Sequence, residues 1–256
     1  MELTNRRALV TGASRGIGKA IALALAEAGA EVLLTGRAVA ELDEVAAATR
    51  GRVFVADLTS RQDGDRLAAE LAADAAVRGP IQILVNNAGI ADSASLEKTS
   101  DAMWDRIQEL NVTAPFRLTR ALLPAMVGSG WGRVINIASN AGLTGYGYTA
   151  AYCASKHALV GLTRALAVDV ARTGVTVNAL CPGWVETQMS ADASARIAGK
   201  TGRSVEESAA ALVAMTPQRR LIAPSEVAHA ARALCAEAAR GIHGQTLVID
   251  GGQVMK

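Results

Sequence analysis

Short apolar runs alternate with longer segments rich in Ala and Leu along most of the chain. The short runs have the length and β-branched content of strands, and they cover residues 7–11, 31–35, 52–56, 81–86, 133–138, 176–180 and 245–249. The longer segments carry helix-forming residues at amphipathic spacing, over residues 17–28, 40–49, 62–76, 101–126, 151–171 and 225–238. This alternation predicts an α/β fold: a doubly wound parallel sheet of about seven strands, flanked by helices on both faces.

Residues 186–215 interrupt the alternation between the sixth strand and the last helix. This segment mixes Ser, Ala and Gly with scattered Met and charged residues, and we expect small helices there that cover a pocket as a lid. The chain shows no internal repeat and no linker, and 256 residues suit one α/β domain. We therefore expect residues 1–256 to form a single domain.

The composition favours a large buried interior and argues against nucleic acid as a partner. Half of the residues are hydrophobic, the net charge is +2 and aromatic residues make up 3%, which leaves little for a basic stripe or a base-stacking platform. The sequence contains no apolar signal stretch at its start and no apolar run of about 18 residues elsewhere. We expect a cytoplasmic protein with no membrane partner.

Cysteines and histidines are few and scattered. The cysteines form no C-x-x-C pair, which predicts free buried thiols rather than a disulfide framework; they are Cys153, Cys181 and Cys235. No two of the three histidines have the spacing of metal ligands. The sequence therefore predicts no metal site.

A glycine-rich turn follows the first predicted strand and opens into a helix. From Thr11 to Gly18 the glycines have the spacing G-x-x-x-G-x-G, which allows a tight turn and a close approach of the backbone to a pyrophosphate at the helix N-terminus. The same glycines would also suit a plain tight connection. Their place in the first β-α unit favours a dinucleotide site and a Rossmann-like fold.

Cofactor choice depends on the end of the second predicted strand. NAD-binding proteins commonly carry a carboxylate there that bonds the adenosine ribose, whereas this chain carries Arg37, with Arg15 in the glycine-rich turn. A 2′-phosphate has nearly two negative charges, so an Arg pairs with it and an Asp repels it. The alternative is that both arginines are solvated surface residues. We predict NADP(H) as the cofactor.

The motifs together resemble the short-chain dehydrogenase/reductase family over essentially the whole chain. The matching stretches are residues 11–18, 57–59, 86–89, 139, 152–156, 181–187 and 249–252. Residues 171–183 look most like 3-oxoacyl thioester reductases and polyketide ketoreductases. Cys153 departs from the family, in which Ser is more usual at that place. The resemblance implies one dinucleotide-binding oxidoreductase domain with a substrate lid at about residues 186–215.

The resemblance also implies which residues hold the cofactor. Asp57 would contact adenine, Pro182 and Gly183 would lie beside nicotinamide, and Thr187 would contact the cofactor. The full set predicted at the cofactor is Gly12, Ser14, Arg15, Gly16, Ile17, Gly18, Arg37, Asp57, Leu58, Asn86, Ala88, Gly89, Tyr152, Lys156, Pro182, Gly183, Val185 and Thr187.

Tyr152 and Lys156 are the predicted proton-transfer pair, because they are four residues apart on one helix face. Lowering the tyrosine pKa from near 10 to about 7 requires about 4 kcal/mol, which one cation about 4 Å away supplies at an effective dielectric near 20. The alternative is that both side chains lie on the helix surface with their polar ends in solvent. Ser139 follows the fifth strand and would hold the substrate oxygen. By resemblance Asn111 would position Lys156 through backbone and water, unless it is a structural buried Asn.

These residues predict reduction of a carbonyl to an alcohol, with Tyr152 as general acid. The best substrate is a 3-oxoacyl thioester on coenzyme A or acyl carrier protein. Another small alcohol, ketone or cyclic hydroxyacyl-CoA is the alternative, and a non-catalytic NADPH-sensing protein is a more distant one. Relatives are commonly tetramers, so we expect a homotetramer.

Overall fold

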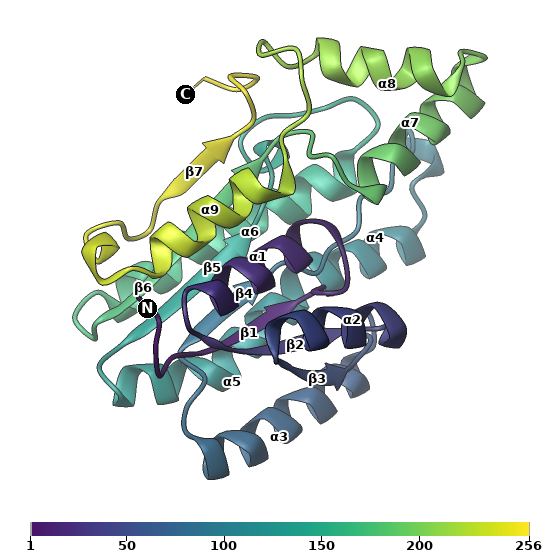
Figure 1. The fold of residues 1–256 in the computed structure, drawn as a ribbon. Helices are drawn as coiled ribbons and strands as arrows, with labels where there is room; N and C mark the ends of the chain where they lie inside the picture. Colours follow the sequence, from purple (N-terminus) through teal and green to yellow (C-terminus); the bar gives the residue numbers. More distant parts are fainter. Residues whose placement is uncertain (1, 256) are drawn as a thin grey trace.

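Seven parallel strands form one sheet in the computed structural model, which describes residues 2–255 (Figure 1). The strands are β1 (Arg7–Thr11), β2 (Glu31–Gly36), β3 (Arg52–Val55), β4 (Ile83–Asn86), β5 (Gly132–Ile137), β6 (Val175–Pro182) and β7 (Thr246–Ile249). Their order across the sheet is β3-β2-β1-β4-β5-β6-β7. The order reverses between β1 and β4, and ligands of open α/β sheets bind beyond the carboxyl ends of the strands at such a point.

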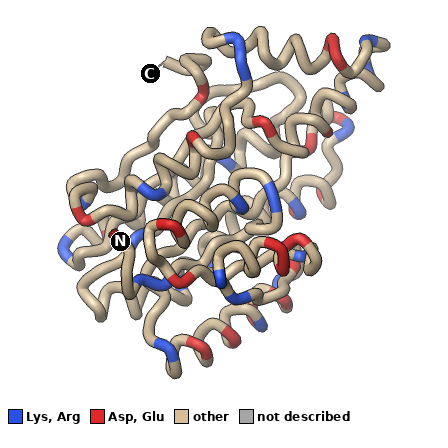
Figure 2. Tube along the Cα trace, viewed as in Figure 1, with Lys and Arg blue, Asp and Glu red and all other residues tan. Residues whose placement is uncertain are grey.

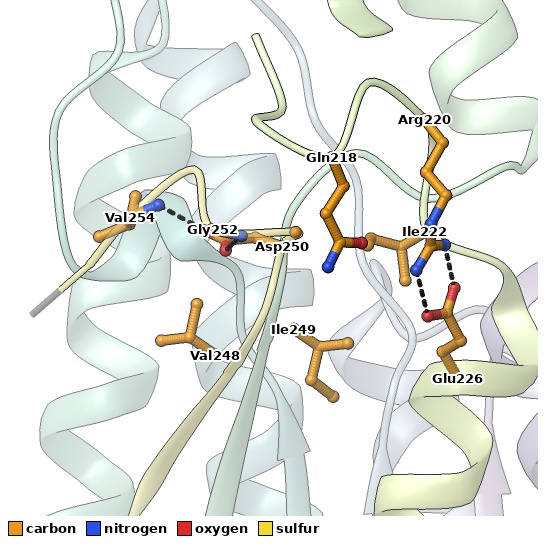
Figure 3. Close-up of a pocket in the computed structure, with 10 residues that line it drawn as sticks. Gln218, Arg220, Ile222, Glu226, Val248, Ile249, Asp250, Gly252 and Val254 are labelled. Carbon is orange, nitrogen blue, oxygen red and sulfur yellow. Dashed lines mark hydrogen bonds and ion pairs between the residues drawn. The ribbon is translucent and has the colours of Figure 1, made fainter.

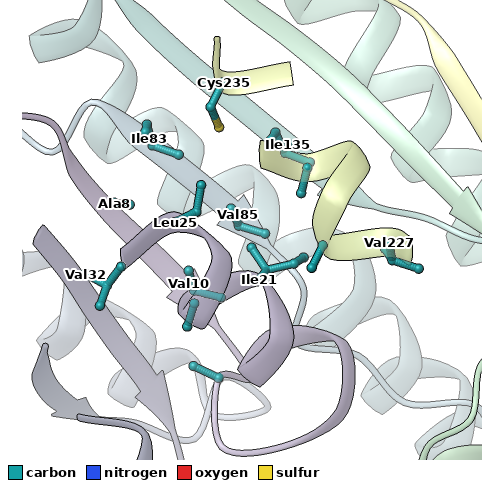
Figure 4. Close-up of a cluster of buried hydrophobic side chains, with 14 of the residues drawn as sticks. Ala8, Val10, Ile21, Leu25, Val32, Ile83, Val85, Ile135, Val227 and Cys235 are labelled. Atoms are coloured by element: carbon teal, nitrogen blue, oxygen red, sulfur yellow. The ribbon is translucent and has the colours of Figure 1, made fainter. Parts of the chain in front are cut away.

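Helices cover both faces of this sheet, as the sequence predicts. One face carries α1 (Gly16–Glu27), α2 (Val39–Thr49) and α9 (Pro224–Cys235). The other carries α3 (Arg61–Arg78), α5 (Ala114–Gly128) and α6 (Ala150–Val170), with α4 (Asp101–Gln108) against α6. Because strand side chains alternate, Val10 packs with Ile21 and Leu25 of α1 (Figure 4), whereas Leu9 packs on the opposite face.

The segment predicted as one helix over residues 101–126 contains an irregular turn. α4 ends at Gln108, Glu109–Thr113 form a π-helical turn (η2), and α5 begins at Ala114. A π turn takes in one residue more than an α turn, so the hydrophobic positions before and after it are out of phase. A hydrophobic period of 3.6 residues therefore predicts one continuous helix and misses this turn.

Residues 186–215 contain two helices, α7 (Gln188–Thr201) and α8 (Val205–Ala214), which pack on each other beyond the carboxyl end of β6 (Figure 1). α8 begins at a capping box: Ser204 Oγ accepts from the Glu207 N–H at 3.0 Å, and the Glu207 carboxylate accepts from the Ser204 N–H at 2.9 Å. The remaining short 3-10 turns are η1 (Leu96–Lys98), η3 (Asn140–Gly142) and η4 (Glu237–Ala239).

Candidate active site

The glycine-rich turn between β1 and α1 has a backbone that requires glycine. Gly12 and Gly16 have φ angles of 63° and 55°, in the left-handed region that other residues rarely adopt. A Cβ on Gly18 would lie 2.2 Å from the carbonyl oxygen of Gly12. α1 has no side-chain cap and no acidic residue in its first turn. Its N-terminal N–H groups can therefore bind an anion.

Asn87 holds this turn against the end of β4. Its Nδ2 donates to the carbonyl oxygens of Thr11 and Gly12 at 2.8 and 3.2 Å. The Thr11 hydroxyl in turn accepts from the backbone N–H groups of Asn87 and Ala88, each at 2.9 Å. Asn87 is absent from the residues predicted at the cofactor, although both of its neighbours in sequence, Asn86 and Ala88, are among them.

The side chain of Asn86 lies in the interior, behind the carboxyl end of β4. Its Nδ2 donates to Asn136 Oδ1 at 2.8 Å and to Thr119 Oγ1 at 3.2 Å, and Asn136 Nδ2 donates to Thr163 Oγ1 at 2.8 Å. These buried hydrogen bonds join β4 and β5 to α5 and α6. The side chain of Asn86 therefore supports the carboxyl edge of the sheet, and its contact with the cofactor stays a prediction.

Arg37 and Asp57 lie together just beyond the ends of β2 and β3. Arg37 Nη1 is 3.4 Å from Asp57 Oδ2, and the Arg37 side chain is 65% exposed. Burial acts to raise the pKa of Asp57, but hydrogen bonds from Thr59 and the charge of Arg37 outweigh it and hold the pKa below its usual value. An ionised Asp57 thus orients a guanidinium that is still open to another anion. Arg15 is also exposed.

Tyr152, Lys156 and Ser139 meet at the carboxyl edge of the sheet. Tyr152 and Lys156 lie in the first two turns of α6, and the Lys156 Nζ is 5.7 Å from the centroid of the Tyr152 ring. Ser139 directly follows β5, its hydroxyl lies close enough to Tyr152 to act on the pKa of the phenol, and it accepts from the Ala141 N–H at 3.1 Å. Lys156 is buried and donates to the carbonyl oxygen of Ile137 at 2.9 Å.

Burial controls the protonation of this pair. It raises the pKa of Tyr152, an effect that the neighbouring Ser139 hydroxyl only partly offsets, and it lowers the pKa of Lys156 to about 8. The phenol pKa thus shifts in the direction opposite to the one that the sequence predicted. The reason is that burial disfavours the charged phenolate more than the groups around it stabilise that charge. Tyr152 therefore keeps its proton, which is the form that a general acid needs.

Asn111 lies in the π turn and is completely buried. Its Oδ1 accepts from the Ile90 N–H, and its Nδ2 donates to the Ile90 carbonyl and to Ser155 Oγ, all at 3.0 Å. A Cβ on Gly89 would lie 3.2 Å from Asn111 Oδ1 and 3.6 Å from Lys156 Nζ. Asn111 thus reaches the surroundings of Lys156, and its own bonds fix the segment after Gly89.

The segment after β6 crosses the same edge of the sheet. Gly183 donates its N–H to the Ile249 carbonyl at 3.0 Å. Thr187 lies against the glycine-rich turn, because a Cβ on Gly16 would be 3.1 Å from Thr187 Cγ2. Two other predicted cofactor residues, Leu58 and Val185, belong to the hydrophobic clusters of the interior, and the partly buried Ile17 packs against one of them.

Within residues 2–255, no group of three or more His, Cys, Asp or Glu side chains is placed to hold a metal ion. None of the helices described is long and apolar enough to cross a membrane.

A glycine-rich turn at a helix N-terminus, with a half-buried Tyr beside a buried Lys and a buried Ser at the same sheet edge, defines a dinucleotide-dependent oxidoreductase. The family model for short chain dehydrogenases matches residues 6–198. The chain therefore belongs to the short-chain dehydrogenase family, as its motifs predicted.

Similar proteins match over nearly the whole chain. The chain is 41% identical to nodulation protein G of Rhizobium sp. (strain N33), over 99% of each chain. It is 38% identical to D-beta-hydroxybutyrate dehydrogenase of Cupriavidus necator, over 98% of this chain and 99% of that one. It is 36% identical to the 3-oxoacyl-[acyl-carrier-protein] reductase of Escherichia coli (strain K12), over 100% of both.

Solved structures share the fold. A variant of the actinorhodin polyketide ketoreductase, crystallised with NADPH, superposes with a TM-score of 0.91 at 37% identity and 97% coverage of both chains. A putative NAD(P) dependent gluconate 5-dehydrogenase from Beutenbergia cavernae, with bound NADP, gives 0.86 at 40% identity and 98% coverage of both. The Rossmann-like fold predicted from the sequence is confirmed.

Proposed function

We propose that this protein reduces a carbonyl compound to an alcohol with NADPH, and that the substrate is a 3-oxoacyl thioester on coenzyme A or acyl carrier protein. The observation that carries the proposal is the meeting of Tyr152, Lys156 and Ser139 at the ligand-binding edge of the sheet, where Lys156 Nζ lies 5.7 Å from the Tyr152 ring centroid and burial raises the pKa of the phenol. A protonated acid beside a second hydroxyl is the arrangement that carbonyl reduction requires.

The residues present fit NADP(H). The uncapped N-terminus of α1 and the close packing at Gly18 suit a pyrophosphate. Arg37 is exposed and oriented by Asp57, which suits a 2′-phosphate. Bound there, the reduced cofactor would supply the hydride to the carbonyl carbon. The two solved neighbours, one with NADPH and the other with bound NADP, support this assignment.

The chain's own residues would manage the proton. Tyr152 donates its phenolic proton to the carbonyl oxygen as that oxygen gains charge, and Ser139 holds the oxygen in place. Lys156 then stabilises the phenolate, since its Nζ lies 5.7 Å from the ring centroid. Asn111 keeps the segment at Gly89 fixed against Lys156 through its bonds to Ile90 and Ser155.

Thioester substrates are supported by the reductase of Escherichia coli and by the putative ketoacyl reductase of Streptomyces coelicolor, which is 38% identical over 96% of this chain and 95% of that one. The hydroxybutyrate dehydrogenase relative supports a small hydroxy or oxo acid as the second candidate. We propose that α7 and α8 form the substrate lid that decides between them. A non-catalytic NADPH sensor would not need the complete set of Ser139, Tyr152 and Lys156.

We further propose a cytoplasmic homotetramer. Phe116, Leu123 and Val127 of α5 and Leu166 of α6 line an apolar groove on the surface, and Phe116 and Val127 are exposed. Exposed apolar grooves commonly become covered by another subunit. Acidic and basic side chains are interspersed elsewhere along the trace (Figure 2). Light scattering coupled to gel filtration tests the tetramer, and a monomer at micromolar concentration would contradict it.

The deciding experiment measures NADPH oxidation by the purified protein across acyl-CoA, acyl-carrier and free ketone substrates. We expect the highest kcat/KM with a 3-oxoacyl thioester, and a loss in kcat of about 100-fold or more for Tyr152→Phe, as is typical of removing a general acid. Tyr148→Phe is the matched control, because Tyr148 is 72% exposed, and its kcat should stay within about twofold of the wild type. No turnover on any substrate would favour the sensor.

A further inference from the structure

Asp250 organises a turn of residues 250–254, called here the Asp250 turn, directly after β7. Asp250 is 3% exposed. Its Oδ1 accepts from the N–H of Gly252 at 3.0 Å, and its Oδ2 accepts from the N–H of Val254 at 2.8 Å (Figure 3). Oδ1 also accepts from the N–H of Gln253 at 3.1 Å. The Asp250 turn is thus built around one buried carboxylate.

Asn140 connects this turn to the proposed substrate-holding serine. It follows Ser139 in η3 and is 4% exposed. Its Nδ2 donates to Asp250 Oδ2 at 3.2 Å and to Gln253 Oε1 at 3.1 Å. Two acceptors on the Nδ2 side fix the orientation of the amide, because an Asn oxygen cannot donate. Asn140 Oδ1 therefore faces Ser139, whose hydroxyl donates to it at 3.5 Å.

The Asp250 turn also contacts the two segments beside the site. A Cβ on Gly183 would lie 2.6 Å from Asp250 Cβ, so the Pro182-Gly183 turn packs directly on it. Four residues after α8 ends, the Gln218 N–H donates to the Gly251 carbonyl at 3.3 Å. The turn therefore contacts the loop of Ser139 and Asn140, the predicted nicotinamide turn and the segment that follows the proposed lid.

We propose that Asn140 and Asp250 are positioning residues that hold the Ser139 side chain where its hydroxyl can meet the substrate oxygen. The inference rests on the proposed function, because it assumes that Ser139 holds a carbonyl oxygen. The Asp250 carboxylate fixes the Asn140 amide, and the Asn140 oxygen accepts the single Ser139 hydroxyl proton until the substrate oxygen replaces it as acceptor. The Ala141 N–H, which donates to Ser139 Oγ at 3.1 Å, fixes the other side of that oxygen.

A double-mutant cycle tests the proposal. Asn140→Ala should lower kcat about tenfold, the size of one hydrogen-bond contribution, with the KM for NADPH unchanged. In a Ser139→Ala background, Asn140→Ala should lower kcat less than about twofold, because the hydroxyl that Asn140 positions is absent. An equal factor in both backgrounds would overturn the proposal.

Asn178→Ala is the matched control for a purely structural effect. Asn178 is as buried as Asn140, donates to the Ile242 carbonyl at 2.7 Å and accepts from the Gln245 N–H at 3.0 Å. It should lower Tm without lowering kcat more than about twofold. If Asn140→Ala does not fold, Gln253→Ala is used instead, because it removes one acceptor of the Asn140 amide at a partly exposed position. It should lower kcat about threefold when Ser139 is present and less when Ser139 is replaced by Ala.

The wild type and Ser139→Ala are measured first, which separates the two claims. Turnover by the wild type together with a loss in Ser139→Ala supports the proposed function. No turnover by the wild type on any carbonyl overturns both the proposed function and the role of Asn140. If the wild type turns over a carbonyl substrate and Asn140→Ala lowers kcat by the same factor with and without Ser139, only the role of Asn140 is overturned.

Discussion

Replacing Arg37 with Asp reverses the charge at the proposed 2′-phosphate position, and the structure sets the size of the effect. A hydrogen bond to a charged group contributes about 1.5–3 kcal/mol, so losing the guanidinium lowers kcat/KM for NADPH about 10- to 100-fold. The new carboxylate adds a repulsion of about 1 kcal/mol per phosphate charge at 4 Å in water. The total loss should therefore be about 100-fold or more, while kcat/KM for NADH should not fall.

The assay measures kcat/KM for both cofactors with one carbonyl substrate at low and high ionic strength. Because the Arg37 side chain is 65% exposed, the effect should shrink as salt increases. Tm should change by only a few degrees, since exposed ion pairs contribute about 1 kcal/mol or less. Arg240→Asp makes the same charge change beside Glu237, near the amino end of β5, and should keep the wild-type ratio. An unchanged NADPH-to-NADH ratio in Arg37→Asp would refute the assignment.

Two further variants test the glycine-rich turn and the buried lysine. Gly18→Ala should lose most of its NADPH affinity in a fluorescence titration, because the new Cβ would lie 2.2 Å from the Gly12 carbonyl oxygen. Gly161→Ala is the control and should keep its affinity, because a Cβ there meets nothing within 4 Å. Equal NADPH affinities of the two variants would contradict the expectation. The pKa of Lys156 is about 8 in the folded protein against an ordinary 10.5, so between these values the unfolded chain binds more protons and stability rises with pH. Thermal denaturation should therefore show that the Tm of the wild type rises relative to that of Lys156→Met as the pH increases from about 8 to 10.5. A difference in Tm that does not change with pH would disprove the burial effect.

The strands were predictable because β1, β4, β5 and β6 are buried along their whole length. Parallel strands that are covered on both faces appear in a sequence as continuous apolar runs. Their ends were less certain. The fourth strand was expected from residue 81 but begins at Ile83, because Ile81 is buried in the second cluster without joining the ladder. Apolar character reports burial and not backbone pairing.

The site was predictable only as far as neighbours in sequence define it. Tyr152 and Lys156 are one helical turn apart, so their proximity followed from spacing. Asn87 bonds to Thr11 across 76 residues, and Asn140 bonds to Asp250 across 110 residues. Contacts of that kind depend on which loops meet at the sheet edge. The direction of the tyrosine pKa shift was also missed, because it depends on how deeply both side chains are buried.

Because of the π turn at Glu109–Thr113, the geometry of the site depends on the exact number of residues between the start of α4 and the end of α5. Each residue of a regular α-helix turns the next by about 100°, so the additional residue in this turn decides which way Asn111 faces. A chain shorter by one residue here would restore uninterrupted α-helical hydrogen bonding between α4 and α5. It would also turn Asn111 away from Ile90 and Ser155, which it now binds. In an alignment of relatives, a gap placed inside this segment therefore marks a change in the active site, even where both flanking helices are preserved.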